Sequence, residues 1–136
     1  MDDLFKVAHN MPKIELHAHI GGCYRPQTFV DLAEEKKINI DHIDFYNVDI
    51  KTAFEIFKVG SQLITTADTL KRVTKEIIED YARQNTRYLE LRSTPKKIGD
   101  ISSKEEYLDS VIDAIKEMKE ERSSLRVCFL VSVNRA

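Results

Sequence analysis

The hydrophobic and polar positions of this chain alternate between two periods, one typical of strands and one typical of helices. Strand-like runs cover residues 13–20, 87–94 and 125–133. Helical periodicity covers residues 2–10, 26–37, 54–64, 68–84 and 103–118, whereas residues 38–50 are polar and irregular. After a first short helix, the order is one strand, three helices, a second strand, a helix and a third strand. That order predicts an α/β fold with parallel strands joined by crossover helices.

Proline and serine mark several element ends. Pro26 stands well as the first residue of the second helix, and Pro95 ends the second strand. Ser103 and Glu106 have the spacing of a capping box and predict the start of the helix that precedes the third strand.

The third strand, residues 125–133, is an almost uninterrupted apolar run. Such a run is typical of a parallel strand buried on both faces, which needs a neighbouring strand and a covering helix. The chain ends at Ala136, directly after this strand. We therefore interpret residues 1–136 as one incomplete domain of a longer fold.

The composition, 42% hydrophobic and 32% charged residues, is that of a globular protein. A net charge of −2 argues against a nucleic-acid partner, which would require a basic surface. No apolar run approaches the ~20 residues of a membrane span, and the acidic N-terminus lacks the layout of a signal peptide. These features favour a cytoplasmic protein without a membrane partner. Cys23 and Cys128 form no motif, and we expect reduced thiols.

The strongest candidate for chemistry is the pair His17 and His19 in the first strand. Residues two apart on a strand point to the same face, so the two imidazoles would lie side by side at the strand end. Two imidazoles suit a divalent metal, although polar residues at a sheet edge are the alternative. Glu15 is expected on the same face. The opposite face would pack Leu16, Ala18 and Ile20 against helices.

A second candidate is the segment 94–97, Thr-Pro-Lys-Lys, directly after the second strand. A hydroxyl followed by basic side chains suits a monophosphate, and a polar loop with two solvated lysines is the alternative. Glu90 and Arg92 share a strand face with Thr94, and we expect them to pair in a structural role, because an unpaired buried charge is costly. His9 and His42 lie outside any motif and are expected on the surface.

Residues 12–22, Pro-Lys-Ile-Glu-Leu-His-Ala-His-Ile-Gly-Gly, resemble the opening strand of the adenosine deaminase family, within the metal-dependent amidohydrolases. Residues 88–96, Tyr-Leu-Glu-Leu-Arg-Ser-Thr-Pro-Lys, are similar to the next strand of that family, and residues 130–135 resemble the end of its third strand. The first two segments are most similar to the branch that acts on N6-methyl-AMP.

The resemblance implies a (β/α)8 TIM barrel with one zinc ion at its C-terminal mouth, of which this chain supplies three strands with their helices. His17 and His19 would be two of the metal ligands. The resemblance places the third histidine ligand, the general acid/base glutamate, a further histidine and a metal-binding aspartate beyond Ala136. Residues 1–136 alone are therefore expected to be inactive. Cytidine-type zinc deaminases are excluded, because neither cysteine fits their P-C-x-x-C motif.

The resemblance also implies a set of substrate contacts, which are His19, Gly21, Ser61, Thr94, Pro95, Lys96 and Asn134. Three of them depart from the nucleotide-acting branch. Gly21 replaces an asparagine there and an aspartate in nucleoside deaminases, Ser61 replaces a histidine, and Asn134 replaces an aspartate. Each lost polar contact is typically worth about 1–3 kcal/mol, so the departures leave the exact substrate open.

Four functions follow. The favoured one is part of a zinc-dependent deaminase that converts N6-methyl-AMP, or another 6-substituted purine nucleotide, by hydrolysis. The alternatives are a deaminase of the nucleoside adenosine, an amidohydrolase with a different substrate, and a truncated, non-catalytic form that binds a partner. The resemblance implies that the full-length form is a monomer.

Overall fold

The computed structural model describes residues 2–121 and 124–133, so Asn134 lies outside the described residues. The elements in chain order are α1 (Asp2–Asn10), β1 (Lys13–His19), the 3-10 turn η1 (Ile20–Gly22), α2 (Pro26–Glu35), α3 (Ile50–Leu63), α4 (Ala67–Arg83), β2 (Thr86–Ser93), α5 (Lys104–Glu121) and β3 (Arg126–Val131). The predicted order of strands and helices is confirmed. The observed ends differ from the predicted ones by a few residues.

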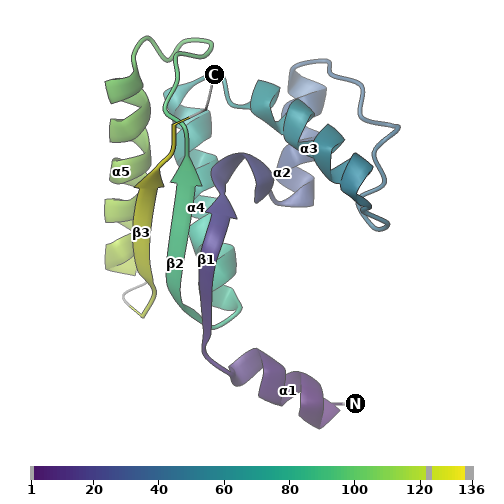
Figure 1. Cartoon of the computed structure of the whole chain (residues 1–136), viewed down its shortest axis with the longest axis vertical. Coiled ribbons are helices and arrows are strands. Elements are labelled where there is room, and N and C mark those ends of the chain that lie inside the picture. The colour runs from purple at the N-terminus through teal and green to yellow at the C-terminus, as the bar shows by residue number, and fades with distance from the viewer. Residues whose placement is uncertain (1, 122–123, 134–136) are drawn as a thin grey trace.

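The three strands form one parallel sheet in the order β1-β2-β3. Helices α4 and α5 cover one face of this sheet, as Figure 1 shows. The core lies between the two layers, where Leu89 and Leu91 of β2 meet Ile77 of α4 and Val111 of α5, all essentially inaccessible to solvent. The predicted α/β fold is confirmed. Parallel strands with helical crossovers on one face are the beginning of a (β/α)8 barrel.

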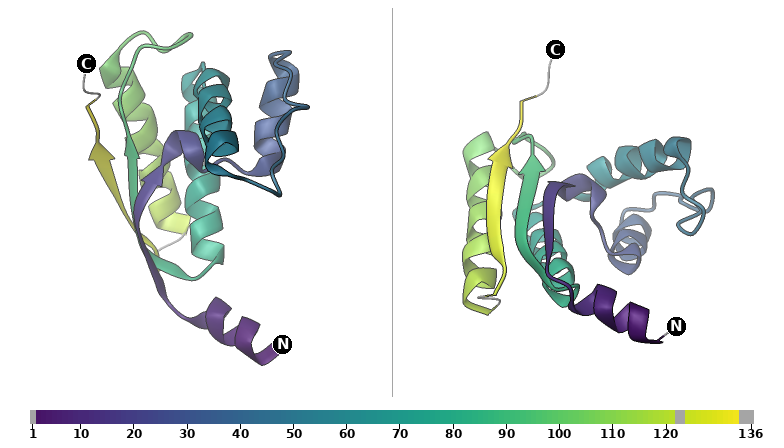
Figure 2. Two further views of the ribbon diagram at one scale, coloured as in Figure 1. Left: turned by 45° about the vertical axis from the view of Figure 1, so that its right-hand side comes forward. Right: turned by 60° about the horizontal axis from the view of Figure 1, so that its bottom comes forward.

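Helices α2 and α3 lie beyond the C-terminal end of β1, apart from the layer of α4 and α5 (Figure 2). Close packing holds α3 against η1. The hydroxyl of Tyr24 donates a hydrogen bond to the Gly60 carbonyl at 2.7 Å, and the ring of Tyr24 meets Phe29 edge to face. A Cβ on Gly60 would lie only 2.9 Å from the Gly21 carbonyl oxygen. The absence of a side chain at Gly60 therefore lets α3 approach the turn that follows β1.

The other face of the sheet carries no helix in the part of the chain that the structure describes (Figure 2). The cover that the apolar sequence of the third strand requires on its second face is therefore not among the described residues. Leu130, which pairs with Arg92 on the open face, is 37% exposed, because only the α5 side of β3 is covered.

The pairing of β1 with β2 is interrupted by a β-bulge. Glu15 pairs with Leu89 and Ala18 pairs with Leu91. Two residues therefore lie between the paired positions on β1, whereas only one lies between them on β2. Because the bulge reverses the alternation of faces, Glu15 lies on the helix-facing side and not beside the histidines. Leu16 is 54% exposed instead of packing against helices. Both expectations for these positions are corrected, whereas Ala18 and Ile20 are buried as predicted.

Three smaller expectations can be compared with the structure. His9 and His42 are exposed, as predicted. Cys23 and Cys128 are both free thiols. Within residues 2–121 and 124–133, no helix combines the length and the apolar character that crossing a membrane requires.

Candidate functional site

The two histidines lie at the C-terminal end of β1, on the open face of the sheet. Their Nε2 atoms are 3.1 Å apart, and their ring centroids are 5.1 Å apart. Two nitrogens bound to one tetrahedral zinc ion, each at ~2.0–2.1 Å, would lie about 3.3 Å apart. The donor atoms of His17 and His19 therefore fit two corners of such a site. No group of three or more potential ligands of the types His, Cys, Asp or Glu occurs among the described residues.

Electrostatics also favour a neutral imidazole at His19. Burial lowers the pKa of His19 below its usual value, and the nearby His17 and Arg92 lower it further. A neutral imidazole keeps one nitrogen lone pair available, which metal coordination requires.

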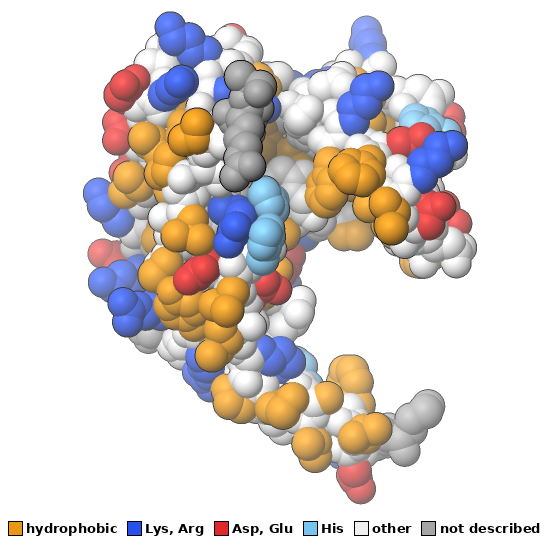
Figure 3. All heavy atoms as spheres, viewed as in Figure 1, with side chains coloured by type: hydrophobic (Ala, Val, Ile, Leu, Met, Phe, Trp, Pro, Cys, Tyr) orange, Lys and Arg blue, Asp and Glu red, His pale blue; other side chains and the backbone are white. Residues whose placement is uncertain are grey.

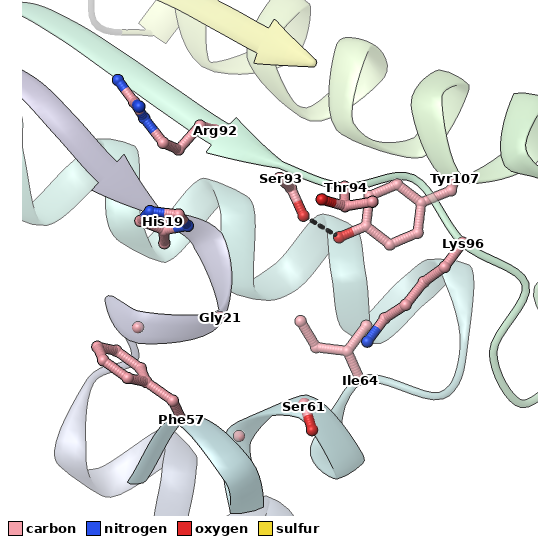
Figure 4. A pocket seen from close by; sticks show the side chains of 12 residues that line it. His19, Gly21, Phe57, Ser61, Ile64, Arg92, Ser93, Thr94, Lys96 and Tyr107 are labelled. Atoms are coloured by element: carbon pink, nitrogen blue, oxygen red, sulfur yellow. Dashed lines mark hydrogen bonds between the residues drawn. The ribbon is translucent and has the colours of Figure 1, made fainter. Parts of the chain in front are cut away.

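A pocket of about 310 Å³ opens next to His19, between the ends of β1 and β2 and the side of α3 (Figure 4). The residues that line it are His19, Gly21, Gly22, Phe57, Gly60, Ser61, Ile64, Arg92, Ser93, Thr94, Lys96 and Tyr107. In Figure 3, histidine side chains lie beside basic ones on the open face, next to the hollow between the sheet and α3. The pocket therefore lies at the C-terminal ends of the strands, where barrel enzymes bind their substrates.

Five of the seven predicted substrate contacts line this pocket, although they come from three separate parts of the chain. These five are His19, Gly21, Ser61, Thr94 and Lys96. Pro95 is buried beside the pocket and does not line it. Asn134 lies outside the described residues.

The loop after β2 is held by a contact that the sequence did not suggest. The hydroxyls of Ser93 and Tyr107 are 2.7 Å apart, which ties the end of β2 to the first turn of α5 (Figure 4). Burial raises the pKa of Tyr107, although its contact with Ser93 opposes this shift. Tyr107 therefore stays a neutral phenol at physiological pH, at the inner end of the pocket.

The expected pairing of Glu90 with Arg92 is wrong. The Glu90 carboxylate accepts a hydrogen bond from the Tyr88 hydroxyl at 2.8 Å. The Arg92 guanidinium donates to the Leu16 carbonyl of β1 at 2.8 Å. Glu90 is therefore bound by the other strand neighbour two positions away, and Arg92 by the backbone of β1.

Sequence reasoning also missed the aromatic side of the pocket. The helical period assigns Phe57 to the apolar face of a helix, yet it lines the pocket and its ring contacts Gly22. Tyr107 belongs to no motif. The spacing of Phe54 and Phe57 is that of an ordinary apolar helix face, so the sequence carried no signal for the pocket position of Phe57.

Comparisons with known proteins agree with this arrangement. The family model described as Adenosine deaminase matches residues 12–136. The Danio rerio protein named N6-Methyl-AMP deaminase is 35% identical over 140 residues, which cover 98% of this chain and 40% of that protein.

Solved structures give the same result. The apo structure of the N6-methyl-AMP deaminase from Arabidopsis thaliana has a TM-score of 0.81 and 31% identity, over 96% of this chain and 42% of that chain. The structure of arabidopsis ADAL complexed with GMP has a TM-score of 0.79 and 32% identity, over 96% of this chain and 43% of that chain. The chain therefore spans about 40% of the length of the relatives that it matches.

Proposed function

Because the chain belongs to the adenosine deaminase family, we propose that it is part of a zinc-dependent hydrolase that removes the 6-amino or 6-methylamino group of a purine nucleotide. The favoured reaction converts N6-methyl-AMP and water into IMP and methylamine. Residues 1–136 would form the first part of the barrel that carries this activity. The Danio rerio and Arabidopsis relatives named after this activity support the choice of substrate class.

One observation carries the proposal: His19, one of the two paired histidines, and the loop after β2 border the same pocket. His19 lies at one side of the pocket, and Thr94 with Lys96 lies at another (Figure 4). A nucleotide offers a base, which reacts, and a phosphate, which is anionic. The lysine ammonium and the threonine hydroxyl suit the phosphate, and the apolar Phe57 and Ile64 suit a purine ring.

His17 and His19 would hold the zinc ion together with ligands from outside the described residues. When bound, zinc supplies a Lewis acid that lowers the pKa of a coordinated water. The other residues of the pocket bind and orient the substrate. Lys96 fixes the phosphate end of the substrate, and the apolar wall from α3 excludes water from one side of the base.

The test uses the native protein. An antibody raised against residues 100–122 should capture it from its source cells, and the captured protein should be incubated with N6-methyl-AMP. We expect equimolar methylamine and IMP, measured by mass spectrometry, and loss of both products after treatment with a chelator. Conversion of adenosine with none of N6-methyl-AMP would instead favour the nucleoside deaminase. A folded, zinc-loaded sample that converts neither purine would contradict the proposal.

A further inference from the structure

We infer that Glu15 and Arg92 are positioning residues that hold the β-bulge of β1, and that this bulge places His17 and His19 on the open face of the sheet. The inference rests on the proposed metal site, because it explains how this chain shapes that site. Neither side chain is a proposed metal ligand or one of the predicted substrate contacts, although Arg92 lines the pocket. Each acts through the backbone of β1.

The bulge changes which face each residue of β1 occupies. Glu15 pairs with Leu89, and Ala18 pairs with Leu91, and both partners on β2 are buried on the helix-facing side. Strict alternation from Glu15 would therefore place His17 and His19 on the helix-facing side as well. One additional residue between Glu15 and Ala18 returns both histidines to the open face, where His19 pairs with Arg92.

A bulge leaves backbone polar groups without their usual partners in the sheet. The Glu15 carboxylate satisfies one of them, because its Oε1 atom accepts a hydrogen bond from the His17 amide at 2.7 Å. This contact joins a charged acceptor to the backbone of a proposed ligand, two residues along the same strand. Hydrogen bonds to charged groups are among the stronger ones in proteins.

The second group is satisfied from the neighbouring strand. Arg92 of β2 donates a hydrogen bond to the Leu16 carbonyl at 2.8 Å. The two contacts thus hold the amide of His17 and the carbonyl of Leu16, which belong to the same peptide unit. That peptide is the additional one in the bulge, so Glu15 and Arg92 fix its orientation from two sides.

The orientation of this peptide sets the direction of the His17 side chain. The Nε2 atoms of His17 and His19 converge to 3.1 Å on the open face. Partners that orient metal ligands typically change metal affinity 10- to 100-fold when they are removed. Glu15 and Arg92 would act in this way, although they contact the ligand backbone instead of the imidazole rings.

The test compares variants of the full-length protein by hydrogen exchange, first without metal and then during a Zn²⁺ titration. We expect faster hydrogen exchange of the His17 amide in Glu15→Ala, and a zinc dissociation constant about 10- to 100-fold higher. Glu15→Gln keeps an acceptor oxygen at the same reach and should restore both values. Arg92→Leu should also speed exchange of the His17 amide, and this measurement tests the bulge from β2 if Glu15→Ala does not fold.

Matched controls separate positioning from a general loss of charge. The side chains of Glu35 and Arg87 are exposed and make no hydrogen bond or ion pair with the described residues, so Glu35→Ala and Arg87→Leu should leave both measurements unchanged. Unchanged His17 exchange and zinc affinity in both Glu15→Ala and Arg92→Leu would overturn the inference. If His19→Ala leaves zinc binding intact, the proposed metal site itself is overturned.

Discussion

At the residue scale, two glycines beside the pocket differ in the space around them. Gly60 lies inside α3, where a Cβ would meet the Gly21 carbonyl oxygen at 2.9 Å and the Tyr24 ring at 3.1 Å. A Cβ on Gly21 would have no neighbouring atom within 4 Å, and the φ of Gly21 is not positive. The pocket could therefore accept a side chain at Gly21, whereas α3 could not approach η1 with one at Gly60.

Replacing these glycines by alanine should change the stability of the protein to different extents. In a helix interior, Gly→Ala usually stabilises by about 1 kcal/mol. At Gly60 we expect a net loss of stability, because overpacking against a backbone atom costs about 1–3 kcal/mol. Gly21→Ala, the matched control, should change stability by less than about 0.5 kcal/mol. Urea denaturation of both variants measures the difference, and a stabilised Gly60→Ala would contradict the packing described for α3.

Two adjacent lysines allow a test of the phosphate end of the pocket. Lys96 lines the pocket, whereas Lys97 is exposed and does not line it. Because a hydrogen bond to a charged group is worth about 1.5–3 kcal/mol, Lys96→Ala should weaken IMP binding roughly 10- to 100-fold. Inosine, which lacks the phosphate, should bind both proteins alike.

Calorimetric titration of the protein with IMP and inosine measures this difference, and Lys97→Ala is the charge-matched control. Equal losses of IMP binding in Lys96→Ala and Lys97→Ala would indicate a diffuse electrostatic effect. In that case Lys96 is not a specific phosphate contact.

Some of these residues were predictable from the sequence, and others were not. His19, Thr94 and Lys96 stand at or just after predicted strand ends, and parallel strands bring such ends together at one edge. Strict alternation places Glu15 on the wrong face, because a bulge adds one residue without changing the local pattern of apolar positions. The contact of Arg92 with the Leu16 carbonyl depends on the same irregularity, so no period read from the sequence could supply it. The strand period does place Tyr88 on the same face as Glu90.

At the element scale, periodicity and caps predicted the helices well. The interior faces of α4 and α5 repeat with the helical period, and their burial agrees with that repeat. The predicted capping box is confirmed in its main contact, because the Glu106 amide donates a hydrogen bond to the Ser103 hydroxyl at 3.0 Å. The Glu106 carboxylate, however, accepts from the amide and hydroxyl of Ser102, each at 2.7 Å. The cap therefore reaches one residue further back than the usual motif.

This cap should make stability depend on pH. The hydrogen bonds from Ser102 hold the pKa of Glu106 below its usual value. A carboxyl whose pKa is lowered on folding contributes stability above its unfolded pKa of ~4.3 and loses it as the pH falls through the folded value. Glu106→Gln should therefore be less stable than the wild type at pH 7, and the difference should shrink at acidic pH.

Thermal unfolding at several pH values measures this effect. Glu105→Gln removes a charge from the same helical turn at an exposed position, and it serves as the control. A difference between wild type and Glu106→Gln that does not vary with pH would contradict a role for the ionised carboxylate in the cap.

At the scale of the whole molecule, the sheet is protected on one face only. Helices α4 and α5 bury the inner side of β2, but the open face presents apolar side chains beside the histidines (Figure 3). The apolar sequence of β3 predicts a strand that is covered on both faces. The described residues cover only the face that packs against α5. This chain matches only about 40% of the length of its relatives, so the family fold contains further elements.

The open face should make the 136-residue chain associate with itself. Both outer strands have an unpaired edge within the described residues, and Leu130 projects from β3 on the same face as Arg92. Unpaired edges and exposed apolar faces favour association. We expect the sedimentation coefficient of the chain to rise with concentration, and Leu130→Lys to reduce that rise.

Ile112→Lys provides a closely matched comparison for this last experiment. Ile112 lies on α5, away from the open face, and its exposure of 38% nearly equals the 37% of Leu130. The two variants gain the same charge and lose an aliphatic side chain of the same size, so they differ only in where the substitution lies. If association depends on the open face, only Leu130→Lys should reduce it. A wild-type chain that stays monomeric at every concentration and melts in one sharp transition would instead show that the half-covered sheet is stable in water.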